Sequence, residues 1–261
     1  MLPTYDAVRF LKVLESGRTR PVLLECELTD DEGVSVGTFV VKAPGLPEVE
    51  DYGLFAETLG YLVAAELGIE TPNAVLVRID DSFVAAVNPV LQRQELVLQP
   101  GLGFGSEHLG SGLIPATADK YLNAEQIEAA LKIFCYDLLI HNYDRLETNP
   151  NCLIKGGRIV AFDYNAAFSF LLAIGNVNEP WEVSKHQIAE KHLFYRALKG
   201  KEIDFKPFIQ AVNDLSVQRL NAVLEEIPFG GGRWNDNIHE HFEAIKKNAS
   251  KLEIEFARCL I

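Results

Sequence analysis

Residues 141–165 read HNYDRLETNPNCLIKGGRIVAFDYN. Two apolar runs, residues 152–155 and 158–162, lie on either side of the pair Gly156 and Gly157. A Gly-Gly pair between apolar runs is a signal for a two-residue β-hairpin turn. The stretch therefore predicts an antiparallel hairpin whose turn is formed by the two glycines.

The position of the turn sets the register of this hairpin. Counting outward from a Lys155–Arg158 pair places Pro150 opposite Asp163, with Asn149 next to it. Opposed residues in antiparallel strands lie about 4.5–5.5 Å apart at Cα. An amide oxygen and a carboxylate oxygen at that separation can share one Mg²⁺, which prefers oxygen ligands in an octahedron. We therefore expect Asn149 and Asp163 to bind a metal ion at the open end of the hairpin.

Asp144 lies on the loop just before the hairpin, where it is expected to face a hydroxyl group instead of the metal. Each of these residues has an ordinary alternative, because Asp, Asn and Pro all favour turns. For any one residue alone the turn is the better interpretation. The three polar residues in register across one hairpin favour a functional site.

The composition limits the classes of function. The chain has 261 residues, enough for one domain or two small lobes, and a net charge of −13. That charge argues against binding to nucleic acids or to anionic membranes. Four scattered cysteines indicate a reducing compartment, and the N-terminal residues do not resemble a signal peptide. The protein is expected to be cytoplasmic.

The first part of the chain is expected to be β-rich. Three strands with polar turns between them, at residues 8–14, 21–29 and 34–43, predict an antiparallel meander. A helix at residues 54–67 and a strand at residues 73–79 are expected to follow.

The next segment is less regular. A short helix and a strand at residues 96–99 are expected within residues 80–100, and the glycine-rich residues 101–112 are expected to be a connector. We therefore expect an N-terminal lobe at residues 1–105 and a C-terminal lobe at residues 106–261.

The second part is expected to be mostly helical. Asn123 and Gln126 have the spacing of a capping box at the start of a helix, and the pattern is helical again from Lys185 to the end. These elements together predict an α+β fold with two lobes.

The chain resembles the HipA-like kinases, in particular the short group without the extra N-terminal subdomain. The resemblance covers roughly residues 4–170, and it implies the two-lobed fold of protein kinases. It rests on the segments Ser16-Gly-Arg-Thr-Arg-Pro21, Phe39-Val-Val-Lys42, Phe55-Ala-Glu57, Phe104-Gly-Ser-Glu107-His-Leu, Asn142-Tyr-Asp144-Arg145 with Asn149-Pro-Asn151, and Ile159-Val-Ala-Phe-Asp163.

The resemblance implies a role for each matching position. One residue, Asp144, would be the catalytic base, and Asn149 and Asp163 would bind Mg²⁺. Further residues would bind ATP: Lys42 at the α- and β-phosphates, Glu57 as the partner that fixes Lys42, Ser16, Gly17 and Thr19 in a loop over the phosphates, and Glu107, His108 and Leu109 as a hinge at the adenine. The loop departs from the kinase pattern, because Gly17 is its only glycine.

Several residues have open alternatives. Glu66 lies nine residues after Glu57, two and a half helical turns, so only one of them can face Lys42, and the resemblance favours Glu57. Asp137 either orders the catalytic loop or is exposed. Arg145 either steadies Asp144, contacts phosphate or forms an ordinary surface ion pair. Four histidines are expected at the surface: His186, His192, His239 and His241.

These observations favour an ATP- and Mg²⁺-dependent kinase that phosphorylates a hydroxyl group, with Ser or Thr of a protein as the expected acceptor. The first alternative is a nucleotide-binding pseudokinase that acts as a regulator by binding a partner protein. The second is a metal-dependent phosphodiester hydrolase built on Asp137, Asp144 and Asp163. The sequence does not identify the acceptor.

Overall fold

The computed structural model describes all residues except 1, 16, 32, 118–120, 174–177 and 187. The chain divides into two compact units, which we describe separately. The barrel unit consists of Met1–Thr58 and Pro72–Gly110, and the helical unit of Leu59–Thr71 and Ser111–Ile261. The expected lobes at residues 1–105 and 106–261 remain a proposal.

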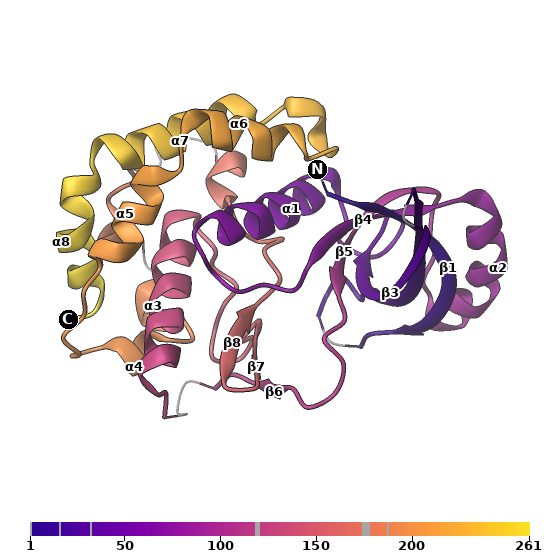
Figure 1. Ribbon diagram of the computed structural model, residues 1–261, viewed down its shortest axis with the longest axis horizontal. Coiled ribbons are helices and arrows are strands. Elements are labelled where there is room, and N and C mark those ends of the chain that lie inside the picture. Colours follow the sequence, from indigo (N-terminus) through magenta and orange to yellow (C-terminus); the bar gives the residue numbers. More distant parts are fainter. Residues whose placement is uncertain (1, 16, 32, 118–120, 174–177, 187) are drawn as a thin grey trace. The chain divides into compact units, whose positions relative to one another are not determined.

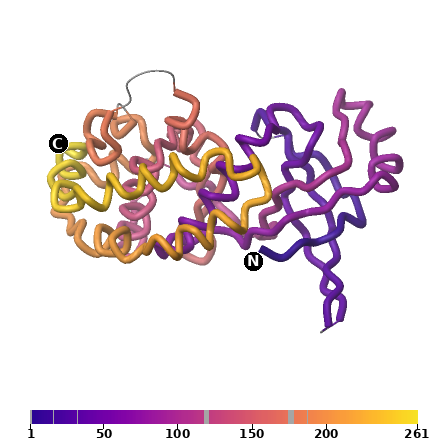
Figure 2. Tube along the Cα trace, turned by 90° about the horizontal axis from the view of Figure 1, so that it is seen from above, coloured from indigo at the N-terminus to yellow at the C-terminus, as the bar shows by residue number. Residues whose placement is uncertain are grey.

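The barrel unit is a closed five-stranded barrel with the strand order β1-β2-β3-β5-β4. The first three strands form the expected antiparallel meander, and β1 also pairs with β4 in parallel. A parallel pair needs a long crossover, which here contains β2, β3 and α1. Figure 2 shows β2 and β3 continuing past the barrel as a hairpin. The elements are β1 (Thr4–Val13), β2 (Val22–Asp30), β3 (Gly33–Lys42), α1 (Asp51–Glu66), β4 (Ala74–Ile79), α2 (Asp81–Leu91), a 3-10 turn (Gln92–Gln94) and β5 (Gly101–Glu107).

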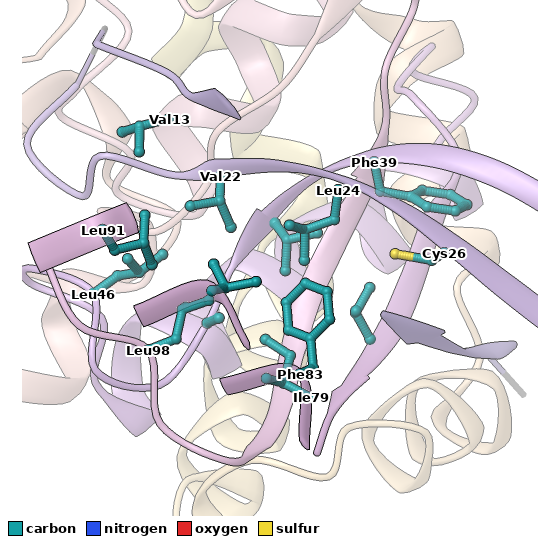
Figure 3. Close-up of a cluster of buried hydrophobic side chains, with 14 of the residues drawn as sticks. Val13, Val22, Leu24, Cys26, Phe39, Leu46, Ile79, Phe83, Leu91 and Leu98 are labelled. Atoms are coloured by element: carbon teal, nitrogen blue, oxygen red, sulfur yellow. The ribbon is translucent and has the colours of Figure 1, made fainter. Parts of the chain in front are cut away.

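Apolar side chains fill the barrel (Figure 3). Along β2, Val22, Leu24 and Cys26 are fully buried, as the two-residue period of a strand requires. Helix α2 contributes Phe83 and Leu91 to the same core. Burial of these side chains stabilises the barrel by roughly 1.5–3 kcal/mol for each large apolar group.

Residues 96–99 do not form the expected strand. Leu96 and Leu98 are still buried in the core. The side chain of Asn88 accepts from the N–H of Leu98 at 2.8 Å and donates to its carbonyl oxygen at 3.0 Å. One amide side chain therefore satisfies the backbone groups that a neighbouring strand would otherwise pair.

The expectation of a connector at residues 101–112 is also wrong for its first seven residues, because these form β5. This strand pairs with both β3 and β4. Its glycines are required by close packing: a Cβ at Gly103 would lie 2.7 Å from the carbonyl oxygen of Lys42, and one at Gly105 would lie 2.9 Å from Val75 and Val77. The glycines reflect a narrow barrel, which composition alone does not distinguish from a flexible linker.

The helical unit contains one long helix beside a small sheet, followed by shorter helices (Figure 1). In the described part of the chain, none of the helices is both long and apolar enough to cross a bilayer. The principal elements are β6 (Ile114–Pro115), α3 (Ala124–Leu139), β7 (Cys152–Lys155), β8 (Arg158–Ala161), α4 (Tyr195–Leu198), α5 (Lys206–Asp214), α6 (Val217–Glu225), α7 (Asn235–Lys247) and α8 (Ala249–Cys259). The 3-10 turns of this unit span Ser169–Leu172, Val183–Lys185, Ala189–Lys191 and Gly230–Gly232.

Local sequence signals account for two features of this unit. The capping box at Asn123 and Gln126 is confirmed, with both reciprocal hydrogen bonds present. The hairpin of β7 and β8 has the predicted register at all four pairs, from Lys155–Arg158 to Cys152–Ala161. The turn glycines, Gly156 and Gly157, both have positive φ, as a two-residue hairpin turn of this type demands.

The C-terminal half of α1 packs in the helical unit through a glycine. The carbonyl oxygen of Gly60 accepts a hydrogen bond from the Tyr136 hydroxyl at 2.9 Å. A Cβ at Gly60 would lie 2.3 Å from the Cβ of Tyr164. The close approach of Gly60 to Tyr164 therefore depends on glycine having no side chain.

Replacing Gly60→Ala is expected to destabilise the protein by about 1–3 kcal/mol, because the added methyl group overlaps the buried Tyr164. Chemical denaturation measures the loss. Gly53→Ala in the same helix is the matched control, since its nearest atom outside the helix would be 3.9 Å away. The control should be neutral or stabilising by up to about 1 kcal/mol. Equal stability of the two variants would contradict the packing described here.

Candidate functional site

Asp144 lies on a short loop that begins directly after α3. The loop opens with His141 at a φ of 52° and the N–H of Asn142 bonded to the carbonyl oxygen of Asp137 at 2.9 Å. The Asp144 carboxylate is half-buried and accepts from Asn149 Nδ2 at 2.8 Å and from Asn151 Nδ2 at 3.3 Å. Two amides thus orient one oxygen of the candidate base.

Asp163 lies just beyond β8. One hydrogen bond, from the N–H of Phe162 to the carbonyl oxygen of Asn151 at 3.0 Å, extends the hairpin past its last paired residues. Asp163 then leaves the strand conformation with a φ of 62°. The structure brings Asn149 and Asn151 to Asp144, while a shared metal site of Asn149 and Asp163 stays a prediction.

Three residues near this loop have left-handed backbone conformations although none is glycine: His141, Asn151 and Asp163. Such conformations cost roughly 1–2 kcal/mol each, less for Asn and Asp, and they persist only where the surroundings enforce them. The fold therefore holds all three of these residues in place.

A buried ion pair enforces this backbone geometry. Arg145 and Asp137 are both fully buried, with Arg145 Nε 2.5 Å from Asp137 Oδ2. Arg145 Nη1 also donates to the carbonyl oxygens of Asn151 and, at 3.0 Å, Phe162. Of the alternatives left open by the sequence, Asp137 therefore orders the loop, and Arg145 forms a buried pair instead of a surface pair.

The charges of this pair are favoured in the interior. Burial alone would raise the pKa of Asp137, but the Arg145 charge and the hydrogen bond from His192 bring that pKa below its usual value. Burial alone would lower the pKa of Arg145, but the Asp137 charge raises it well above its usual value. Both groups are therefore ionised at neutral pH.

The barrel unit holds the second set of candidate residues. Lys42 Nζ lies 2.9 Å from Glu57 Oε2, and both side chains are buried, so the expected ion pair is present. Glu66 binds Arg219 at 2.6 Å instead. The role of Lys42 and Glu57 at the phosphates of ATP is not tested by this contact and stays a prediction.

The loop between β1 and β2 carries the residues expected over the phosphates. Gly17 is exposed with a φ of 91°, and Thr19 is buried. Ser16 lies outside the described residues. Contact of this loop with the phosphates of ATP stays a prediction.

The expected hinge follows the end of β5. The N–H of Glu107 donates to the carbonyl oxygen of Asn73, and the N–H of His108 donates to that of Thr38, both at 2.8 Å. These two donors are used within the barrel unit. The contact of residues 107–109 with adenine stays a prediction.

The expectation of surface histidines is wrong for three of the four, because His186, His192 and His241 are buried. His192 Nε2 lies 3.0 Å from Asp137 Oδ2, so this histidine belongs to the buried ion pair. The two residues are 55 positions apart, and no local pattern in the sequence links them. His192 is the site residue that the sequence analysis missed.

The other two buried histidines gather around His141. The ring centroid of His141 lies 4.0 Å from that of His186 and 5.7 Å from that of His241. His241 stacks on Phe170 and shares with His141 the lining of a cavity of about 350 Å³. Burial lowers the pKa of His141 to about 2 and that of His241 to about 4, so both rings are neutral near pH 7.

Within the described residues, no three His, Cys, Asp or Glu side chains are grouped as a metal-binding cluster. Asp137 in particular has its oxygens directed to Arg145, Asn142 and His192. A hydrolytic metal centre that uses Asp137 together with Asp144 and Asp163 is therefore not supported.

A family model described as HipA-like kinase matches residues 7–259. The structure is similar to that of the Helicobacter pylori proinflammatory kinase CtkA, with a TM-score of 0.57 and 11% identity over 98% of both chains. A weaker similarity, with a TM-score of 0.33 and 9% identity, links 98% of this chain to 67% of the Neurospora crassa PAN3 pseudokinase. No curated protein matches the chain in sequence.

The buried histidines predict a loss of stability in acid. An unfolded histidine takes up a proton near pH 6.5, whereas folded His241 does so near pH 4 and His141 near pH 2. Below pH 6.5 the unfolded state therefore binds more protons, and the free energy of unfolding falls by up to about 1.4 kcal/mol per pH unit for each such group. Denaturant titrations between pH 7 and pH 4 measure this slope.

The variant His241→Phe removes one of these groups and should flatten the slope between pH 6.5 and pH 4, even if it is less stable at pH 7. An unchanged slope in the variant would show that His241 does not supply the dependence.

Proposed function

The chain belongs to the HipA-like kinase family, and we propose that it is an ATP- and Mg²⁺-dependent phosphotransferase that moves the γ-phosphoryl group to a hydroxyl group. The observation that carries the proposal is the orientation of Asp144. Its carboxylate is fixed by two amides on a loop that the buried Arg145 anchors. A base on a rigid loop, half-exposed, is what hydroxyl activation requires.

In this proposal Asp144 orients the acceptor hydroxyl and takes its proton. Asn149 and Asp163 supply the amide and carboxylate oxygens that Mg²⁺ prefers, so their chemistry fits the ion. When bound, the ion would neutralise negative charge on the phosphates. The protein's own contribution is positioning and electrostatic stabilisation.

The barrel unit would bind the nucleotide. Lys42 carries a charge that Glu57 holds in one position, and a fixed cation is suited to the α- and β-phosphates. The loop with Gly17 and Thr19 would cover the phosphates, and residues 107–109 would meet the adenine. Together with the mixed α/β fold, these roles amount to a two-lobed, kinase-like architecture.

The acceptor that we propose is a Ser or Thr hydroxyl of a protein. Family membership supports a kinase-like function and leaves the acceptor open. The net charge of −13 disfavours nucleic acid as a substrate, since phosphate backbones need clustered positive charge.

A nucleotide-binding pseudokinase is the second candidate. One specific observation favours it: Gly17 is the only glycine in the turn between β1 and β2, so the backbone there has less freedom to wrap phosphates. Such a protein would bind ATP and act through a partner protein without transferring phosphate.

Two substitutions test the proposed roles. Asp144→Asn removes the base and Asp163→Asn weakens the metal ligand, so each should lower phosphate transfer from Mg-ATP by at least about 10²-fold. Asp163→Asn should also weaken Mg²⁺ binding. Release of ADP from Mg-ATP and transfer of labelled phosphate to the protein itself measure the effect.

Asp236→Asn, an exposed position at the start of α7, is the matched control and should retain wild-type turnover. Wild-type rates in both site variants would refute the assignment. Stabilisation of the wild-type protein by ATP in a thermal shift, with no phosphate transfer, would instead identify a pseudokinase.

A further inference from the structure

His192 lies in the segment that follows the 3-10 turn Ala189–Lys191, far from the catalytic loop in sequence. Its ring is buried, with 1% of the residue exposed. Nδ1 accepts a hydrogen bond from the N–H of Phe194 at 3.1 Å. The other ring nitrogen, Nε2, therefore carries the proton and donates to Asp137 Oδ2 at 3.0 Å.

The backbone around His192 is attached to the same loop. The N–H of Leu193 donates to the carbonyl oxygen of Arg145 at 3.0 Å, and His192 forms an isolated β-bridge with Leu146. The backbone of this segment thus holds the two residues directly after Asp144, while the ring holds Asp137.

Asp137 in turn binds one residue on each side of Asp144, Asn142 before it and Arg145 after it. Its Oδ1 accepts from Asn142 Nδ2 at 2.8 Å, and its Oδ2 accepts from Arg145 Nε at 2.5 Å. The side-chain oxygen of Asn142 accepts from the N–H of Asp144 at 3.3 Å. A shift of the Asp137 carboxylate would therefore move the candidate base from both sides.

The guanidinium of Arg145 extends the linkage to the hairpin. Its donation to the carbonyl oxygens of Asn151 and Phe162 places the residues immediately before β7 and before Asp163. Both hairpin ends adopt left-handed conformations at this point, at Asn151 and Asp163. The geometry of the base and of the metal ligand depends on one buried cluster: Asp137, Asn142, Arg145 and His192.

We propose that His192 is a positioning residue for phosphoryl transfer, which acts by fixing Asp137 and, through Asn142 and Arg145, the orientation of Asp144. This inference rests on the proposed function. It assigns to the C-terminal part of the chain a role in the reaction, although none of its residues needs to touch the substrate.

The test compares two substitutions at one position. His192→Gln keeps a side-chain N–H donor for Asp137, whereas His192→Phe fills the space without a donor. Small misplacement of a reacting group costs on the order of 10²-fold in rate. We expect His192→Phe to lower kcat by about that factor with KM for ATP nearly unchanged, and His192→Gln to recover most of the rate.

Loss of stability must be separated from loss of positioning. Val212→Ala in α5, at a fully buried position whose apolar side chain forms no hydrogen bonds, provides a control with a lowered melting temperature. Activity is measured as ADP release from Mg-ATP well below the melting temperature of each variant. The control is expected to keep the wild-type kcat.

The outcomes distinguish this inference from the function on which it rests. A wild-type protein without turnover refutes the proposed function and the positioning role with it. An active wild type overturns the positioning role alone in any of three cases: His192→Phe keeps its kcat, His192→Gln is as impaired as His192→Phe, or Val212→Ala loses as much activity.

Discussion

The buried ion pair of Asp137 and Arg145 is the interaction on which the loop that carries Asp144 depends. Removing two charges from water costs several kcal/mol for each ion, and only complete hydrogen bonding recovers that cost. Here the carboxylate accepts from Asn142, Arg145 and His192, and the guanidinium donates to backbone carbonyl oxygens. The pair is therefore stable only when the α3 end, the loop and the hairpin are all in place, which makes their assembly cooperative.

This cooperativity explains how an irregular loop can be rigid. The left-handed residues His141, Asn151 and Asp163 would relax in an isolated peptide, since non-glycine residues avoid that region. In the protein, the loss of a bond to buried Arg145 costs more than the strain that relaxation would release. Rigid placement of a carboxylate is in turn what a reaction that relies on positioning demands.

The features that the sequence predicted well are those with local causes. The Gly156-Gly157 turn sets the hairpin register. The pairing of Lys42 with Glu57 was implied by the family resemblance, and the ion pair is present. Features set by distant packing were missed. The glycines of β5 reflect a tight barrel, Asn88 replaces a strand partner for Leu98, and His192 reaches Asp137 from 55 residues away. The residue type at each position gives no indication of these partners.

The anchoring of the hairpin also has an evolutionary consequence. Arg145 binds Asn151 and Phe162 through their carbonyl oxygens, which every amino acid possesses. Mutations at position 162 can therefore change the side chain without removing the acceptor, whereas Arg145 and Asp137 supply bonds that no other residue types reproduce. Selection is thus expected to preserve Arg145 and Asp137, whereas sequence drift is tolerated at position 162, which these residues hold through its backbone alone.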